Sequence, residues 1–405
     1  MKKNTQAMKK PRTQQSVKKK ADKMTDERRY DPRIWKMLNP DAAGIDVHSD
    51  QMWVCVPADR AEQHVRKFGA YADDLYAIAD FLATCRITSV AMESTGVYWI
   101  PLYQVLETRG FSVCLTNARH LKSIAGRPKT DRLDCQWIQR LHSYGFLNAS
   151  FRPADELCQI RAIQRHRETL VREASRHIQH MQKALDQMNL KLSNVLTDIT
   201  GVSGMTIIDH ILQGERNPAY LATFRDHRCK TSEAEIAKAL TGDYREEHLF
   251  VLRQAVEGYR FVQQQLQGCD REIEARLTAI DKQVDASETP PPPRLTRGTS
   301  HTPKKMTFQR DGHTMLYACF GTDVTALPGI DLSVGCGLFS ELGADLSAWP
   351  TGKRVTAWLG FSPLEQSSGE TLKSSKTRKV TNRASRIFRL AARSAGRSKT
   401  ALGAF

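Results

Sequence analysis

Short apolar runs, separated by polar turns and amphipathic stretches, dominate the chain from residue 42 to about residue 116. The run 42–47 predicts a buried strand, the alternating residues 51–56 predict its hairpin partner, and 64–68 predict a third strand. Further along, the pattern predicts a helix at 72–85, a strand at 89–93, a helix at 98–109, a strand at 111–115 and helices across 117–143. Three strands followed by alternating helices and strands is the order of a ribonuclease-H-like α/β domain. The chain contains no G-x-G-x-x-G or Walker motif, which argues against a doubly wound nucleotide-binding fold.

A helical period replaces the strand pattern in the middle of the chain. Apolar residues at a spacing of three or four predict a long helix at 155–190, and a seven-residue repeat predicts a second one at 246–282. We predict an antiparallel coiled-coil hairpin with residues 191–244 as its helical tip. A plain helical bundle within one domain fits the same pattern equally well. The polar residues Gln263 and Asp270 interrupt the repeat, so a very stable zipper is not expected.

Changes in composition divide the chain further. Residues 1–35 have almost no large apolar side chains, which predicts disorder until a partner binds. Four consecutive prolines, Pro290 to Pro293, mark a linker. The expected fold class is therefore α/β plus α, and the expected domains are a basic disordered tail at 1–38, a ribonuclease-H-like mixed-sheet domain at 39–150, a helical coiled-coil domain at 151–286, a Pro-rich linker at 287–305 and a small, mainly helical C-terminal domain at 306–405.

Charge is concentrated near the two ends. The chain has 60 Lys and Arg against 44 Asp and Glu, a formal net charge of +16. Residues 1–35 hold 12 basic and 4 acidic side chains, and residues 353–399 hold 12 basic and 2 acidic ones, so the remainder is slightly acidic. Such blocks suit the phosphate backbone of a nucleic acid. A solvated tail or a patch for a membrane surface has a similar composition, but neither needs the carboxylates described below.

Other compositional signals concern location. Nine scattered cysteines without a C-x-x-C pair predict reduced thiols and a cytosolic protein. No apolar run approaches about 18 residues, so no membrane span is expected. The basic N-terminus has no apolar segment after it, so no secretory signal is expected.

Four acidic residues stand where strands are predicted to end or helices to begin: Asp46, Glu93, Asp131 and Asp134. Phosphodiester chemistry with two metal ions about 3.5–4 Å apart needs about four carboxylates, because Mg²⁺ prefers hard oxygen ligands. Asp131 and Asp134 share one face of a helix at their i, i+3 spacing. A plainer interpretation makes Asp131 a helix cap and Asp134 a solvated side chain. That interpretation suits Asp46 poorly, because a carboxylate within an apolar strand is costly without a partner.

With these residues placed, the chain resembles the Piv/MooV-type DEDD transposases and DNA invertases of bacterial insertion sequences, from about Ala42 to Arg397. The matching segments, in order, are Gly44-Ile45-Asp46-Val47, Glu93-Ser94-Thr95-Gly96-Val97-Tyr98-Trp99, Lys129-Thr130-Asp131 with Asp134, Leu327-Pro328-Gly329-Ile330, Ser340-Glu341-Leu342-Gly343, Trp358-Leu359-Gly360-Phe361-Ser362-Pro363 and Gln366-Ser367-Ser368-Gly369. A set of this kind is specific, although no single segment would be.

The resemblance implies a RuvC-like domain in which Asp46, Glu93, Asp131 and Asp134 bind Mg²⁺, as two ions for which Mn²⁺ can substitute. It implies a C-terminal transposase domain whose serine attacks DNA and forms a covalent phosphoserine intermediate. The family motif of a proline, four residues and a serine gives Ser368 after Pro363, and the adjacent Ser367 stays open as the alternative. It also implies double-stranded donor and target DNA, and recombination guided by a structured RNA.

Basic residues near these motifs are expected to contact phosphates. They are Lys129, Arg132, Lys373, Lys376, Arg378, Lys379, Arg383, Arg386 and Arg389. The serines themselves are expected in a polar loop. Paired strand exchange and long helices favour a homodimer or homotetramer, and we expect the protein in the bacterial cytoplasm on the nucleoid.

Two other functions remain open on sequence alone. A RuvC-like nuclease or resolvase would use the acidic residues to activate water, and its serines would play no part. A scaffold that binds RNA or DNA without catalysis would retain the basic blocks while its acidic residues had decayed.

Overall fold

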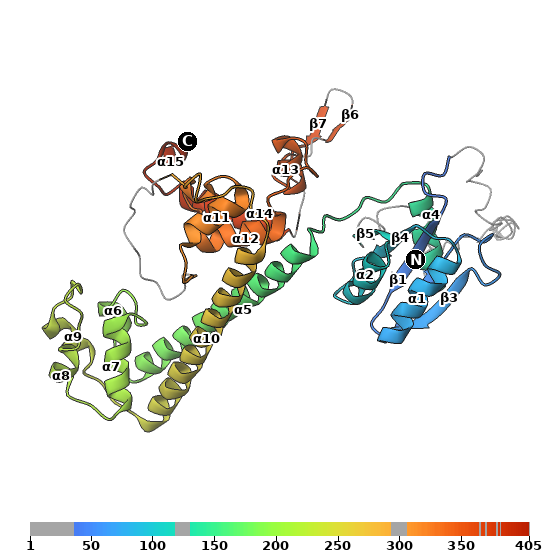
Figure 1. The fold of residues 1–405 in the computed structure, drawn as a ribbon. Helices are drawn as coiled ribbons and strands as arrows, with labels where there is room; N and C mark the ends of the chain where they lie inside the picture. Colours follow the sequence, from blue (N-terminus) through green and yellow to red (C-terminus); the bar gives the residue numbers. More distant parts are fainter. Residues whose placement is uncertain are drawn as a thin grey trace, which may run out of the picture. The chain divides into compact units, whose positions relative to one another are not determined.

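The computed structural model describes residues 36–117, 130–292, 306–363, 366–368, 371–377, 380 and 382–404. The chain divides into two compact units, Met1–Phe151 and Arg152–Phe405, which we describe separately (Figure 1). Most of the expected tail at 1–38 and most of the expected linker at 287–305 lie outside the described residues, as does Lys129.

The first unit is built on a mixed five-stranded sheet of order β3-β2-β1-β4-β5. The strands are β1 (Ala42–Val47), β2 (Gln51–Cys55), β3 (Val65–Gly69), β4 (Ser89–Glu93) and β5 (Ser112–Thr116). The first three strands pair antiparallel, whereas β1–β4 and β4–β5 pair parallel. The helices are α1 (Ala72–Thr84), α2 (Trp99–Thr108) and α4 (Asp131–Ser143). The predicted order of strands and helices is confirmed wherever the structure describes it.

The two faces of this sheet pack differently. One face buries Ile45 and Val47 of β1 in a core that also includes buried residues of α1 and α2. The other face lies against α4, whose Trp137, Ile138 and Leu141 cluster with a strand residue at the sheet centre. Gly44 makes this second contact close, because a Cβ atom there would overlap the backbone of α4. The helix therefore rests directly on the backbone of β1.

The second unit begins with two long helices, α5 (Asp155–Gln187) and α10 (Glu246–Ala279), which lie side by side (Figure 1). Leu185, near the end of α5, shares a core with Leu252, near the start of α10, whereas Ile160 packs with Ile273, so the pair is antiparallel. The predicted helix hairpin is confirmed in outline. Whether the pair forms a regular coiled coil stays a prediction.

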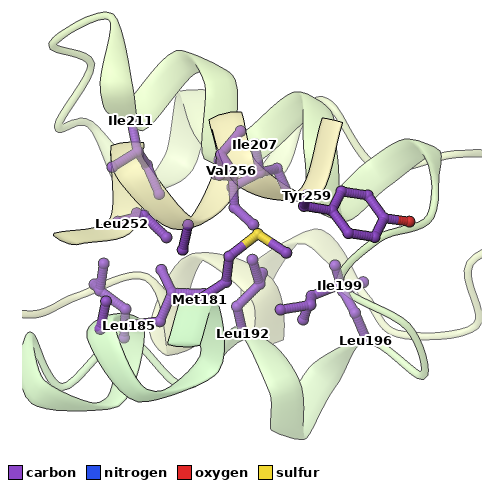
Figure 2. Close-up of a cluster of buried hydrophobic side chains, with 14 of the residues drawn as sticks. Met181, Leu185, Leu192, Leu196, Ile199, Ile207, Ile211, Leu252, Val256 and Tyr259 are labelled. Carbon is purple, nitrogen blue, oxygen red and sulfur yellow. The ribbon is translucent and has the colours of Figure 1, made fainter. Parts of the chain in front are cut away.

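Between the long helices, the chain forms α6 (Leu192–Val195), α7 (Val202–Leu212), α8 (Pro218–Ala222) and α9 (Glu233–Ala239). These elements form the helical tip that the sequence predicts. Figure 2 shows Met181 of α5 among Ile207 of α7 and Val256 and Tyr259 of α10, so the tip and the long helices share one core.

The remainder of the second unit packs on the other end of the long helices. It contains α11 (Gly312–Phe320), a 3₁₀ turn η2 (Val324–Ala326), α12 (Leu332–Leu342), α13 (Gly352–Trp358), β6 (Gln366–Ser368), β7 (Thr371–Ser374), α14 (Arg383–Ala395) and α15 (Ala401–Ala404). Leu316, Cys336 and Phe339 share a core with Ile160 and Leu277 of the long helices.

The segment with the two serines differs from the expected polar loop. Residues 366–368 form strand β6, which pairs antiparallel with β7; Ser367 is opposite Leu372 and Ser368 is opposite Thr371. The loop prediction was wrong because Gln, Ser and Ser show no apolar alternation, whereas pairing in such a ribbon depends on backbone hydrogen bonds.

Candidate metal centre

Asp46 is the central carboxylate of the first unit. Side chains alternate along a strand, so Asp46 faces the same side as Gly44, toward α4. Its side chain is buried, with 6% of the residue exposed. Burial raises the pKa of Asp46, a hydrogen bond from His48 opposes that shift, and the nearby charges of Asp134 and Glu93 raise the pKa further. Asp134 and Glu93 therefore lie close enough to Asp46 for their charges to act on its carboxylate.

Glu93 comes from the neighbouring strand. The parallel register pairs Ile45 with Met92, so Glu93, the last residue of β4, follows beside Asp46. It is also buried, and Thr95 Oγ1 donates a hydrogen bond of 2.6 Å to Glu93 Oε1. The turn after the strand thus fixes the carboxylate at the carboxyl edge of the sheet.

Asp131 and Asp134 both lie in the first turn of α4. The helix runs antiparallel to β1, because Gln139 donates to the carbonyl of Ala42 and the helix start lies near Asp46. Thr130 is the N-cap, and its Oγ1 accepts a hydrogen bond from the amide of Leu133. The capping role considered for Asp131 is therefore taken by the preceding residue, and both carboxylates are left for other contacts.

Three side chains converge at the end of β1. His48 Nε2 lies 3.0 Å from Asp46 Oδ2 and 3.8 Å from Asp131 Oδ1. One ligand atom from each of Asp46, His48 and Asp131 lies within 4.8 Å of the other two, an arrangement found for no other three His, Cys, Asp or Glu side chains in the part of the chain that the structure describes. Sequence reasoning missed His48; the signal was its position two residues after Asp46.

The donor set fits a divalent cation. Carboxylate oxygens are the ligands that hard cations prefer, and a buried carboxylate such as Asp46 needs a positive partner. Two residues of this unit were expected to contact phosphate, Lys129 and Arg132, and the structure describes Arg132. Its side chain is exposed and lies in α4 between Asp131 and Asp134.

The other predicted site residues belong to the second unit. The backbone of Ser367, Ser368 and Lys373 lies in the β6–β7 hairpin, while Arg378 and Lys379 lie outside the described residues. Lys376, Arg386 and Arg389 are exposed. The guanidinium of Arg389 lies 5.5 Å from the centre of the Phe361 ring. Arg383 instead donates to Glu168 of α5 at 2.9 Å.

A mixed sheet with carboxylates at the ends of β1 and β4, in a chain with a strongly basic C-terminal segment, fits an enzyme that acts on nucleic acid with a divalent metal. The class of DNA transposases and recombinases follows from comparison with known families. Two family models match the chain: a DEDD-type IS110 transposase model at residues 43–190, and a model described as the transposase IS116/IS110/IS902 family at residues 322–405. Together they cover more than half of the sequence, and the chain belongs to the IS110-type family of DEDD transposases. No curated protein matches it.

The family confirms three predictions. The first unit is a RuvC-like domain, the protein is a DNA transposase or recombinase, and its substrate is DNA. The acidic cluster and the family together support dependence on a divalent metal. Among the described residues, no helix is both long and apolar enough to cross a membrane.

Proposed function

We propose that this transposase cleaves and rejoins DNA strands with a metal centre at Asp46, Glu93, Asp131 and Asp134 and with a serine nucleophile, Ser368. Ser367 is the alternative nucleophile. The observation that carries the proposal is the packing of α4 on Gly44, which brings acidic residues from distant parts of the sequence to the end of β1.

The chain's own residues prepare the metal centre. Asp46 is held between the sheet and α4, and Thr95 orients Glu93. Asp131 and Asp134 stand at a helix N-terminus, where free backbone amides favour negative charge. We propose that the four carboxylates hold two Mg²⁺ ions, with Mn²⁺ as a substitute. Bound there, the ions would lower the proton affinity of an attacking hydroxyl and balance charge on the scissile phosphate.

The serine would provide the covalent step. Attack by Ser368 forms a bond from Oγ to phosphorus and breaks the bond from phosphorus to the leaving deoxyribose oxygen. The proton of the serine hydroxyl is given up, and the leaving oxygen takes up a proton. Attack by another deoxyribose hydroxyl on the phosphoserine reverses these changes and joins the new strand. The bond energy is kept, so strand exchange needs no external energy source.

The exchange of strands between two DNA molecules and the basic segments near the chain ends indicate the partners. Donor and target DNA would bind along Arg132, Lys376, Arg386 and Arg389, together with Lys129, Lys373, Arg378 and Lys379. We also propose a structured guide RNA and a homodimer or homotetramer, in which the acidic site and the serine meet within one subunit or between two. Such a protein would work in the bacterial cytoplasm, on the nucleoid.

Covalent trapping tests the proposal. Full-length protein is incubated with Mg²⁺ and a DNA substrate from the flanks of its own gene, then denatured, and protein–DNA adducts are counted. The wild type should form an adduct that Ser368→Ala abolishes while metal binding survives. Asp46→Asn should remove both adduct and strand joining.

The controls separate the alternatives. Loss of the adduct in Ser367→Ala, with Ser368→Ala active, would move the nucleophile by one residue. An adduct that persists in both serine variants would refute the serine mechanism and favour hydrolysis by water. Strand joining that survives in Asp46→Asn would refute the metal mechanism and leave only binding.

A further inference from the structure

His48 lies at the end of β1, beside the proposed metal centre. It directly follows β1, and its amide donates to the carbonyl of Gln51 at 3.0 Å across the turn into β2. Gly44 and Asp46 face α4 because side chains alternate along a strand, and the imidazole of His48 lies 3.8 Å from Asp131 of the same helix. The backbone of His48 is therefore held by the sheet and by the turn into β2.

The imidazole is close enough to two carboxylates to share a cation with them. Its Nε2 lies 3.0 Å from Asp46 Oδ2 and 3.8 Å from Asp131 Oδ1, and all three ligand atoms lie within 4.8 Å of one another. Nitrogen and oxygen ligands lie about 2.0–2.2 Å from a small divalent ion, so two ligands of one ion are separated by about 3–4.4 Å. A shift of a few tenths of an ångström would bring all three onto one ion.

Resting on the proposed metal centre, we propose that His48 is a metal ligand through Nε2 and that it gives this site a preference for Mn²⁺ over Mg²⁺. Mg²⁺ prefers oxygen ligands and gives up its water reluctantly. Imidazole nitrogen suits the first-row transition ions better than it suits Mg²⁺. An imidazole among the carboxylates would therefore raise the affinity for Mn²⁺ more than the affinity for Mg²⁺.

A second role for the same contact makes a different prediction. In that role, His48 only donates a hydrogen bond to Asp46 and orients the carboxylate. Its loss would then weaken the binding of both ions by a similar factor, and no nitrogen would contact the metal. The two roles are separable without any measurement of strand transfer.

Pulsed electron paramagnetic resonance on the full-length protein, loaded with Mn²⁺ alone, tests the ligand directly. The wild type should show the ¹⁴N coupling of a directly bound imidazole, and His48→Gln should lack it. His64→Gln is the matched control, because His64 precedes β3 at the end of the sheet away from Gln51 and should leave the coupling unchanged. Absence of the coupling in the wild type overturns the inference whether or not any variant folds.

Calorimetric titration with each ion tests the preference. His48→Gln should weaken Mn²⁺ binding at least about tenfold and change Mg²⁺ binding much less, so that the ratio of the two dissociation constants collapses. An equal loss for both ions would show a positioning role only. Metal binding by Asp46→Asn shows whether a failure concerns this inference or the proposed function on which it rests. Unchanged binding of both ions in that variant would refute the metal centre itself, whereas loss in Asp46→Asn with no change in His48→Gln would refute only the role of His48.

Discussion

Arg167 of α5 and Asp270 of α10 form a buried ion pair between the two long helices. Each side chain is only 4% exposed. The guanidinium donates through both Nε and Nη2 to the two carboxylate oxygens, and Asp270 Oδ2 also accepts the amide of Thr307 at 3.0 Å. Asp270 thus joins both long helices to the segment that begins the C-terminal part of the chain.

Removing one partner of this pair should destabilise the second unit strongly. Asp270→Ala leaves a guanidinium buried without its charge partner, and such changes typically cost about 3–5 kcal/mol. Urea unfolding followed by circular dichroism measures the change. Arg383→Ala, which breaks the more exposed pair with Glu168, is the matched control and should cost about 1 kcal/mol or less. Equal losses of unfolding free energy in the two variants would contradict the prediction that the buried pair is the costlier one to break.

Gly44→Ala tests the contact that positions the acidic residues. The added Cβ would overlap the backbone of Cys135 and Gln139, so α4 must move off β1. We expect about 1–3 kcal/mol of destabilisation, as for overpacked cores, together with weaker metal binding. Thermal unfolding in a chelator measures the first effect, and calorimetric titration with Mn²⁺ measures the second.

The helix α10 offers the control for that substitution. Gly268 has open space around the position of a Cβ, so Gly268→Ala should be neutral or stabilise the protein by up to about 1 kcal/mol. It should leave metal binding unchanged. Metal affinity that is preserved in Gly44→Ala would show that the close packing of α4 is not what assembles the centre.

The sheet and the long helices could be predicted because their signals are local. Residues 42–47 form one apolar run, and Leu252, Tyr259 and Leu266 repeat every seven positions, so each element is visible within its own segment. Asp270 looked like an interruption of that repeat because its partner, Arg167, lies 103 positions away. The β6–β7 hairpin escaped prediction for a related reason, since polar residues that pair only through their backbone leave no periodic signal.

The candidate site likewise combines features with a local sequence signal and features that depend on long-range packing. Asp46 stood out because a carboxylate in an apolar strand needs an explanation, and the spacing of Asp131 and Asp134 pointed to one helix face. The role of Gly44 and the approach of His48 depend on how α4 lies on the sheet. That arrangement is tertiary, and a single sequence does not encode it in any local pattern.

His142 predicts a pH dependence of the first unit. The ring is buried, its Nε2 lies 2.7 Å from Ser89 Oγ, and burial lowers the pKa of His142. The unfolded chain then binds a proton at a higher pH than the folded one. Above about pH 6.5, the pKa of a histidine in the unfolded chain, His142 contributes fully to stability. This contribution is lost as the pH falls from there toward the lower pKa of His142 in the folded protein.

Urea unfolding between pH 8 and pH 5 measures this effect. As the pH falls through that window, the unfolding free energy of the wild type should decrease more steeply than that of His142→Asn, by up to about 1.4 kcal/mol per pH unit. His227→Asn, which removes a side chain that is 87% exposed, controls for the loss of a histidine. An identical pH profile in the wild type and in His142→Asn would contradict the prediction.

The arginines of α14 should divide into two kinds. Arg386, Arg389 and Arg393 follow a spacing of three and four, so they share one face of the helix, and all three are exposed. Each one that contacts a DNA phosphate should add about 0.9 to the slope of log affinity against log salt concentration. Replacing each by alanine should therefore reduce the slope of duplex binding by about one.

Arg383 provides the internal comparison, because its guanidinium is already paired with Glu168 of α5. Arg383→Ala should leave the salt slope of duplex binding unchanged, and its effect should appear in the unfolding free energy. Fluorescence anisotropy with a labelled duplex between 50 mM and 200 mM salt measures the slopes. A slope that falls for Arg383→Ala but not for Arg386→Ala would mean that the Glu168 pair opens on DNA and that the exposed face of α14 does not contact phosphate.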